Sequence, residues 1–262
     1  MGKLEAVFDK QVVVVTGGGG GIGRALCIGF AAEGASVVAI GRRSGTLEET
    51  ARLCSRPITT VCVDLRQKDA CFRAIEEIIA THGRIDVLVN NAAVSGGGLF
   101  LERPFQEWAD AIALNVVATA ACCKAVLPQM IRQGHGRIIT LTTRLAGMRS
   151  YGGSSYSASK AAVSALTRCI AAELGDRHPN VLINDLIPGP TKTGMSKSGQ
   201  DPAKVYPYVR KLALLPSGGP SGQVFFREAR YSQFGIRHMY FCLSLWRASL
   251  RRKSAKSAQR KR

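Results

Sequence analysis

Five consecutive glycines, residues 17–21, separate an apolar run from a helical pattern near the start of the chain. Val12–Val15 are apolar without alternation, which is typical of a strand buried on both faces of a parallel sheet. Glycines lack Cβ atoms, so this backbone can turn sharply and let a diphosphate approach its N–H groups. A helix that begins near Ile22 directs its positive dipole end toward that anion. The stretch therefore predicts a strand, a phosphate-binding turn and a helix, and the flanking elements argue against a flexible glycine linker.

The rest of the chain alternates apolar runs with amphipathic patterns. Strands are expected at 12–15, 35–40, 58–63, 86–89, 137–141, 181–187 and 223–226. Helices are expected at 24–33, 46–54, 69–82, 105–131 and 156–174, with 99–106 and 191–220 irregular. This order predicts an α/β fold, a doubly wound parallel sheet of about seven strands with helices on both faces and ligands at the carboxyl ends of the strands.

Charge is unevenly distributed along the 262 residues. Residues 236–262 hold nine Lys and Arg and no Asp or Glu, half of the net charge of +18. We expect a single domain over 1–235 and an atypical basic C-terminal tail over 236–262. A moderately basic body suits phosphorylated cofactors or acidic substrates. Nucleic acid is an expected partner only through non-specific contact with the tail, which could instead contact anionic lipid or stay solvated.

Targeting and metal-binding signals are not apparent in the sequence. Residues 1–10 carry four charged side chains without an apolar run, which argues against a signal peptide. No stretch approaches the roughly 20 apolar residues of a membrane span, so a cytoplasmic protein is expected. The eight cysteines show neither C-x-x-C spacing nor pairing with His, which favours buried reduced thiols and no metal site.

Tyr156 and Lys160 lie four residues apart on a predicted helix and therefore project from one face. A phenol has a pKa of about 10, and a neighbouring ammonium favours the phenolate, which suits acid/base chemistry. Such a pair also occurs by chance in many helices. Thr143 comes after the fifth predicted strand, where its hydroxyl could orient a carbonyl oxygen or, with Thr142, merely end the strand.

Asn115 interrupts the apolar run A-I-A-L-N-V-V-A in the middle of the long predicted helix. A buried amide without partners costs about 1–3 kcal/mol. Two interpretations stay open: a satisfied core amide, or a residue that opens the helix locally and holds a water or a catalytic side chain.

Taken together, these motifs resemble the short-chain dehydrogenase/reductase family over roughly residues 8–226. The motifs are T-G-x-x-x-G-I-G at 16–23, N-N-A at 90–92, Asn115, Y-x-x-x-K at 156–160 and P-G at 188–189. The resemblance implies a Rossmann-type fold and a homodimer or homotetramer. It also implies an NAD(P)-dependent oxidoreductase that transfers hydride between a nicotinamide cofactor and a carbonyl or secondary alcohol substrate. The alternative is a non-catalytic dinucleotide-binding protein with an altered C-terminus.

The resemblance also implies roles for individual residues. Tyr156 would be the general acid/base, Lys160 would bind the nicotinamide ribose and lower the tyrosine pKa, and Asn115 would hold a relay water. Thr143 stands where the family usually has serine, with Thr142 as the fallback. Asn90 would stabilise the central sheet, and Asp64 would lie near the adenine. The full set of expected cofactor-binding residues is Thr16, Gly17, Gly21, Ile22, Gly23, Arg42, Asp64, Leu65, Asn91, Ala92, Tyr156, Lys160, Pro188, Gly189, Thr191 and Thr193.

The chain departs from the family pattern at several positions. Thr143 adds a methyl group, Ala93 replaces the glycine usual after N-N-A, and the sequence from Ile236 onward is atypical, as a shifted reading frame or a lineage-specific extension would produce. A substrate pocket with apolar walls is expected from Met195, Tyr206, Tyr208, Val209, Leu212 and Leu214.

Cofactor choice depends on the residues directly after the second strand. An NAD enzyme of this architecture commonly has a carboxylate there, which binds the ribose hydroxyls and repels a 2′-phosphate. This chain has Gly41, Arg42 and Arg43 instead. Guanidinium groups suit bidentate phosphate contact, so we expect NADP(H) to be preferred over NAD(H), mainly through Arg42. The alternative is a solvated basic pair.

Overall fold

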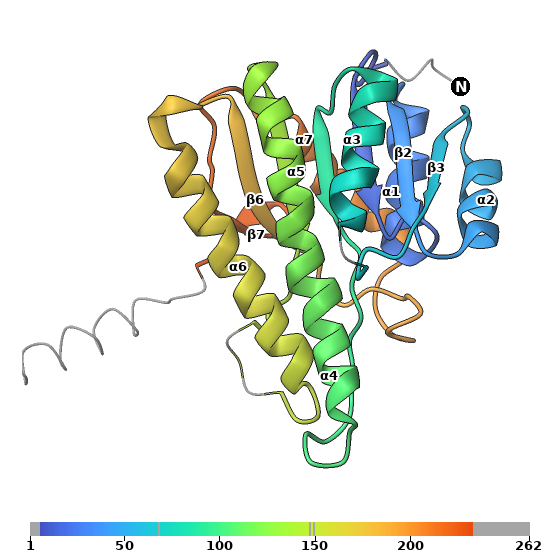
Figure 1. The fold of residues 1–262 in the computed structure, drawn as a ribbon, viewed down its shortest axis with the longest axis vertical. Helices are drawn as coiled ribbons and strands as arrows, with labels where there is room; N and C mark the ends of the chain where they lie inside the picture. The colour runs from blue at the N-terminus through green and yellow to red at the C-terminus, as the bar shows by residue number, and fades with distance from the viewer. Residues whose placement is uncertain (1–5, 68, 147, 149, 233–262) are drawn as a thin grey trace, which may run out of the picture. The chain divides into compact units, whose positions relative to one another are not determined.

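The computed structural model describes residues 6–67, 69–146, 148 and 150–232. Its centre is one eight-stranded sheet with the order β3-β2-β1-β4-β5-β6-β7-β8 (Figure 1). The strands are β1 (Val12–Thr16), β2 (Ser36–Gly41), β3 (Thr59–Cys62), β4 (Val87–Asn90), β5 (Gly136–Leu141), β6 (Val181–Ile187), β7 (Val224–Phe226) and β8 (Ala229–Arg230). All neighbours pair in parallel except β7 and β8. The predicted doubly wound parallel sheet is confirmed, and the short antiparallel β8 was not expected.

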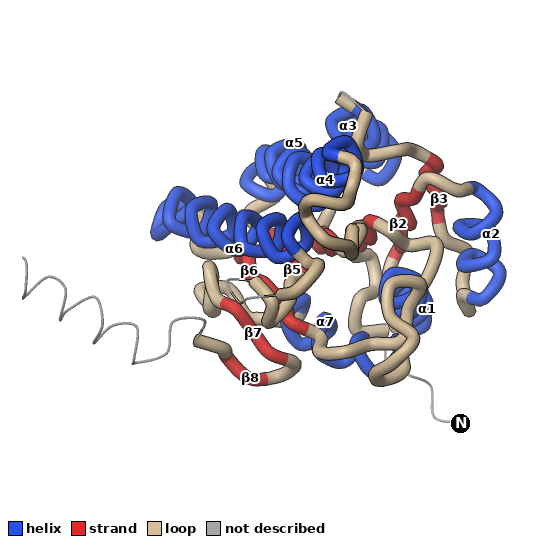
Figure 2. Tube along the Cα trace, turned by 90° about the horizontal axis from the view of Figure 1, so that it is seen from below, coloured by secondary structure: helices blue, strands red, loops and turns tan. Residues whose placement is uncertain are grey.

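Helices cover both faces of the sheet, as Figure 2 shows. One core joins the sheet to α1 (Gly21–Ala32), α2 (Ser44–Leu53) and α7 (Tyr206–Ala213). The other joins it to α3 (Ala70–His82), α5 (Thr119–Arg132) and α6 (Ser154–Leu174). Shorter pieces are α4 (Phe105–Ile112), the π-helical η1 (Ala113–Ala118) and the 3₁₀ turns η2 (Gly175–Arg177) and η3 (Pro202–Val205). Alternate residues of each strand serve opposite cores because successive side chains of a strand point to opposite faces.

The expectation that 191–220 is irregular was wrong in part, because this segment contains η3 and α7. Val205, Val209 and Leu212 recur at helical spacing and are at most 2% exposed in the first core. Burial against the sheet stabilises this helix, which has only eight residues and would not be stable in isolation. Val209 and Leu212 therefore belong to the core and do not form a wall of a substrate pocket.

The predicted helix 105–131 is a nearly continuous helical segment, Phe105–Arg132, made of α4, η1 and α5. Among the residues described, this segment alone is long and apolar enough to cross a membrane by length and composition, with a mean hydropathy of 1.7 over 18 of its residues. The sequence analysis did not anticipate such a segment. In this fold the apolar face of the segment packs on the sheet. Cys122, Val126 and Met130 share the second core with Leu88 of β4 and Ile138 of β5.

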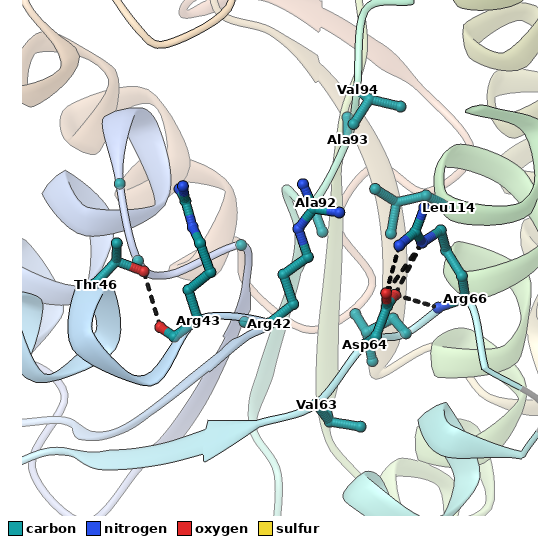
Figure 3. Close-up of a pocket in the computed structure, with 15 residues that line it drawn as sticks. Arg42, Arg43, Thr46, Val63, Asp64, Arg66, Ala92, Ala93, Val94 and Leu114 are labelled. Carbon is teal, nitrogen blue, oxygen red and sulfur yellow. Dashed lines mark hydrogen bonds and ion pairs between the residues drawn. The ribbon is translucent and has the colours of Figure 1, made fainter. Parts of the chain in front are cut away.

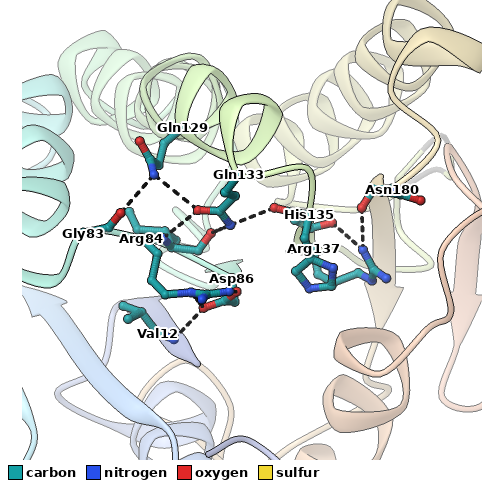
Figure 4. A network of polar contacts seen from close by, with 11 residues as sticks. Val12, Gly83, Arg84, Asp86, Gln129, Gln133, His135, Arg137 and Asn180 are labelled. Atoms are coloured by element: carbon teal, nitrogen blue, oxygen red, sulfur yellow. Dashed lines mark hydrogen bonds and ion pairs between the residues drawn. The ribbon is translucent and has the colours of Figure 1, made fainter. Parts of the chain in front are cut away.

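A polar network joins the strands at their amino ends, away from the expected site (Figure 4). The buried Asp86 accepts hydrogen bonds from Val12 N at 2.8 Å and from Arg84 Nε and Nη2 at 2.8 and 2.6 Å. Gln133, directly after α5, donates to the carbonyls of Ile85 and His135, each at 2.7 Å. The network fixes β1 and α5 at the start of β4.

The described residues up to Arg230 belong to one compact unit, and the chain from Tyr231 onward falls outside it. Only Tyr231 and Ser232 of this last part are described. The basic tail expected over 236–262 lies outside the described residues, so the division at 235 stays a prediction. All seven described cysteines are free, and Cys27, Cys71, Cys122 and Cys123 are buried.

Candidate active site

The glycine loop after β1 adopts a conformation that depends on missing side chains. Gly17 and Gly21 have φ of +70° and +49°, in the left-handed region that favours glycine. A Cβ on Gly23 would lie 2.1 Å from Gly17 O and 2.6 Å from Asn91 Nδ2. The start of α1 therefore packs directly on the loop backbone, as a diphosphate-binding turn requires.

The loop carbonyls are held by neighbouring side chains. Arg24 Nη2 donates to Gly19 O at 3.0 Å and also pairs with Glu49 of α2. Thr50 Oγ1 donates to Gly18 O at 3.0 Å. The first N–H groups of a helix have no partner within the helix. Those at the start of α1 can therefore bind an anion beside a loop whose carbonyls are already occupied.

Thr16 and Asn91 fasten the ends of β1 and β4 beneath this loop. Thr16 Oγ1 accepts hydrogen bonds from Asn91 N and Ala92 N, both at 3.0 Å. Asn91 Nδ2 donates to Thr16 O at 2.8 Å. Both residues thus support the loop, and Ala92 borders the adjoining cavity.

A first cavity of about 220 Å³ lies beside the glycine loop. It contains the predicted residues Gly17, Arg42, Asp64, Leu65 and Ala92. Its other lining residues are Gly19, Gly20, Gly41, Arg43, Thr46, Val63, Arg66, Ala93, Val94 and Leu114.

Three arginines and one carboxylate line this first cavity. Figure 3 shows Arg42 and Arg43 extending in the same direction after β2, while Arg66 lies against Asp64. Arg66 Nε and Nη2 donate to Asp64 Oδ1 and Oδ2 at 3.0 and 2.6 Å, and this pairing lowers the pKa of Asp64. Asp64 thus neutralises Arg66, and the guanidinium groups of Arg42 and Arg43 leave the cavity positively charged. The sequence analysis missed Arg66 because the pairing depends on a turn after β3.

A second cavity, of about 660 Å³, lies beyond Ile22. Seven predicted site residues border it: Ile22, Thr143, Tyr156, Pro188, Gly189, Thr191 and Thr193. Most of its remaining wall is apolar or glycine, with Leu145, Met148, Tyr151, Met195 and Phe226 among the side chains. Of the pocket wall expected from the sequence, only Met195 borders this cavity.

Tyr156 of α6 borders this cavity, and Lys160, one turn later on the same helix, is buried with its Nζ 5.8 Å from the centre of the Tyr156 ring. The buried Lys160 ammonium donates to Leu141 O at 2.7 Å. Burial lowers the pKa of Lys160 to about 8 and raises the pKa of Tyr156. The expected lowering of the tyrosine pKa by Lys160 is therefore absent from this structure, because desolvation dominates and the ammonium faces a carbonyl.

The two threonines after β5 differ in their surroundings. Thr142 is 4% exposed, and its Oγ1 lies 3.5 Å from Lys160 O and 3.4 Å from Ser164 Oγ on α6. Thr143 is half-buried, borders the cavity with Tyr156, and accepts a hydrogen bond from Leu145 N at 3.3 Å. Thr143 is thus the more accessible hydroxyl beside Tyr156.

Asn115 lies in the π-helical turn η1 and is fully buried. Its Oδ1 accepts from Val94 N at 2.9 Å, and its Nδ2 donates to Val94 O at 2.9 Å and Ser159 Oγ at 3.0 Å. The amide is therefore satisfied, as one interpretation expected, and the helix is also locally widened. Asn115 ties the loop after β4 to the residue preceding Lys160.

A buried polar row crosses the sheet beneath α5 and α6. Asn90, Thr140 and Asp185 are register partners on β4, β5 and β6. Asn90 Oδ1, Thr140 Oγ1 and Asp185 Oδ2 have no hydrogen-bond partner among the described residues. Thr167 Oγ1 donates to Asp185 Oδ1 at 2.7 Å. The hydroxyl of Thr140 has one proton, which it can donate to Asn90 or to Asp185 but not to both. A protonated Asp185 would donate to Thr140 and leave the Thr140 proton for Asn90.

Asp185→Asn is expected to stabilise the protein at neutral pH. Burial raises the pKa of Asp185 from 3.8 to about 6, although the hydroxyls of Ser164 and Thr167 and the charges of Lys160 and Arg168 oppose the shift. Because the pKa of Asp185 is higher in the folded than in the unfolded state, the contribution of its protonated carboxyl to stability is complete below pH 3.8. This contribution is lost as pH rises through about 6. The amide avoids this loss, so the free energy of unfolding should rise by roughly 1–3 kcal/mol at neutral pH.

Chemical denaturation of the wild type and Asp185→Asn across this pH range measures the effect. The stabilisation should shrink toward acidic pH, where the carboxyl is already protonated. A difference that is independent of pH would contradict the assignment.

Comparisons with known proteins agree with this geometry. The sequence profile of the family described as short chain dehydrogenase matches residues 11–203. The chain is 35% identical over 193 residues to the short-chain reductase protein NovJ of Streptomyces niveus, covering 72% of each protein. It is 34% identical over 217 residues to a 3-oxoacyl-[acyl-carrier-protein] reductase of Synechocystis sp., covering 81% of this chain and 85% of that protein.

Among solved structures, the short chain dehydrogenase from Shigella flexneri has a similar fold. The TM-score is 0.78 at 24% identity, covering 86% of this chain and 93% of that one. The profile match spans β1 to β6, and so includes the glycine loop and the Tyr156–Lys160 pair. The chain therefore belongs to the short chain dehydrogenase family.

Proposed function

We propose that this chain is an oxidoreductase that transfers hydride between NADP(H) and a carbonyl or secondary alcohol, with Tyr156 as general acid/base. The observation that carries the proposal is the arrangement around the glycine loop. Gly19 and Gly20 border the positively charged cavity, while Ile22 borders the large cavity that also contains Tyr156 and Thr143. A cofactor held at the loop would thus lie between a phosphate site and a proton donor.

The bound nicotinamide cofactor would supply or accept the hydride. Tyr156 would give a proton to the carbonyl oxygen in reduction and remove it from the hydroxyl in oxidation. The raised pKa of Tyr156 keeps the phenol protonated at neutral pH, which suits the reductive direction. Thr143 would orient the substrate oxygen, and Lys160 would bind the ribose hydroxyls, with Asn115 and Ser159 fixing this turn of α6.

Two features of the first cavity support a fit to NADP(H). Gly17, Gly19 and Gly20 border the cavity without side chains, so the loop backbone can approach a diphosphate there. Beyond the end of β2, Arg42 and Arg43 border the cavity, and Asp64, the one carboxylate among its described lining residues, is paired with Arg66. Guanidinium groups favour a 2′-phosphate, whereas NAD(H) would need a free carboxylate near its ribose.

Arg42→Ala is expected to weaken NADP(H) binding by roughly 10- to 100-fold and to change NAD(H) binding little. The reason is that only NADP(H) carries the 2′-phosphate proposed to bind this guanidinium. Titration calorimetry with both cofactors measures the difference. Arg52→Ala, at the other end of α2, is the matched control and should bind both cofactors as the wild type does. Equal losses for the two cofactors, or a wild type that prefers NAD(H), would refute the assignment.

A turnover screen tests the enzymatic proposal itself. The absorbance of NADPH and of NADH should be followed in the presence of ketones, sugars, steroids and 3-oxoacyl thioesters. Oxidation of NADPH with at least one carbonyl class is expected. Tight cofactor binding without turnover on any class would favour the alternative, a non-catalytic dinucleotide-binding protein.

Other expectations stay predictions. These are a homodimer or homotetramer, a cytoplasmic location, and contact with nucleic acid only through the basic tail.

A further inference from the structure

Two guanidinium groups flank one aromatic ring on the wall of the large cavity. Phe226, the last residue of β7, borders the cavity together with Tyr156. Arg144 Cζ lies 5.6 Å and Arg227 Cζ 5.4 Å from the centre of the Phe226 ring. The Arg227 guanidinium also lies next to Gly189, which borders the same cavity. Segments after β5 and β7 thus bring two positive charges to one place.

These charges have no carboxylate partner in the part of the chain that the structure describes. The described residues that line the cavity include Arg144 and no Asp or Glu. Neither Arg144 nor Arg227 takes part in an ion pair among the described residues. Five other arginines do pair with carboxylates: Arg24, Arg66, Arg84, Arg103 and Arg210. Arg144 therefore gives the cavity wall a positive charge, and the guanidinium group of Arg227 lies beside the wall residues Phe226 and Gly189.

Contact with an aromatic ring leaves the hydrogen-bonding capacity of a guanidinium unused. A cation over a ring at an exposed site gains only about 0.5–1 kcal/mol. The N–H donors of arginine lie in the plane of the group and match the geometry of carboxylate and phosphate oxygens. The Phe226 ring can thus hold the guanidinium groups of Arg144 and Arg227 in place while their N–H donors remain available to a bound anion.

The rest of the cavity suits an apolar molecule. Its volume is about 660 Å³, and Leu145, Met148, Tyr151 and Met195 border it. These four side chains are 37–93% exposed, which makes an apolar surface at the cavity that a substrate could cover. The wall thus combines apolar area with a positive group near Thr143, the neighbour of Arg144 in the chain.

We propose that Arg144 and Arg227 bind an anionic group of the substrate, a carboxylate or a phosphate ester, and that the substrate is an apolar ketone or alcohol with such a group. This inference rests on the proposed function, because it assigns the substrate class of the same site. Phe226 acts as a positioning residue that holds the two guanidinium groups at the cavity.

The test compares keto acids of increasing chain length with their neutral methyl esters, using NADPH and the full chain. A parallel series pairs keto phosphate monoesters with their neutral esters, and the series with the larger charge preference identifies the anion. The wild type should show at least about tenfold higher kcat/KM for the acid at the best length. Arg144→Gln and Arg227→Gln should each lose more on acids than on esters, and Arg144→Lys should recover part of the preference.

Arg73→Gln on α3 is the control and should retain the wild-type preference. Equal kcat/KM for acid and ester in the wild type, or equal losses on both in the variants, would overturn the inference while leaving the proposed function intact. Absence of turnover with every ketone would instead contradict the proposed function. In that case calorimetric titration of the same acids and esters decides the inference, and equal affinities would overturn it.

Discussion

Tyr156→Phe is expected to lower kcat by roughly 100- to 10,000-fold while NADP(H) binding stays close to that of the wild type. The ring of Tyr156 borders the large cavity and would still pack in its place on α6. The substitution removes only the hydroxyl whose proton the reaction needs. In the proposed function the cofactor is held mainly by the glycine loop and the arginines of the first cavity, which this change does not touch.

Single-turnover and steady-state measurements with the best carbonyl from the turnover screen, together with cofactor titration, separate these effects. Tyr208→Phe is a matched control, because Tyr208 lies on α7 and borders neither cavity. It should keep a kcat similar to that of the wild type. Near-normal turnover in Tyr156→Phe would contradict the role of Tyr156 as general acid/base.

Gly23→Ala is expected to reduce both NADP(H) affinity and stability. Its Cβ would lie 2.1 Å from Gly17 O and 2.6 Å from Asn91 Nδ2, so the loop or the start of α1 must move. Overpacking of this kind costs about 1–3 kcal/mol, and a displaced loop should weaken cofactor binding by roughly 10- to 100-fold. Cofactor titration and chemical denaturation measure the two losses.

Gly45→Ala in α2 provides the matched control for this substitution. A Cβ at Gly45 meets no atom within 4 Å. Alanine favours a helix by up to about 1 kcal/mol over glycine, so this variant should bind NADP(H) normally and be no less stable. If Gly23→Ala behaved in the same way, the close packing of the loop on α1 would not matter for the cofactor.

The sequence by itself determined β1 to β7, most of the helices between them and the type of sheet. Runs such as Val12–Val15 and Val37–Ile40 are apolar on both faces, and local periodicity alone distinguishes them from the amphipathic helices between them. The glycine loop and the Tyr156–Lys160 spacing were also readable, because a turn needs its glycines locally and a helix aligns residues four apart. The roles of these site residues stay predictions.

Only the tertiary structure decided which side chains meet across the sheet. Helix α7 was missed because it is stabilised by burial of Val209 and Leu212 against the sheet. The contacts of Asn115 with Val94 and Ser159 join segments 21 and 44 residues apart.

The same limit applies to the charged groups. The register that aligns Asp185 with Thr140, and the meeting of Arg144 with Phe226, depend on neighbouring strands that are distant in sequence. Periodicity reports which face of an element is apolar, but the burial and pairing of a charge depend on the elements that pack against it. Those long-range contacts raise the pKa of Asp185 and place two guanidinium groups beside Phe226, a residue of the cavity wall.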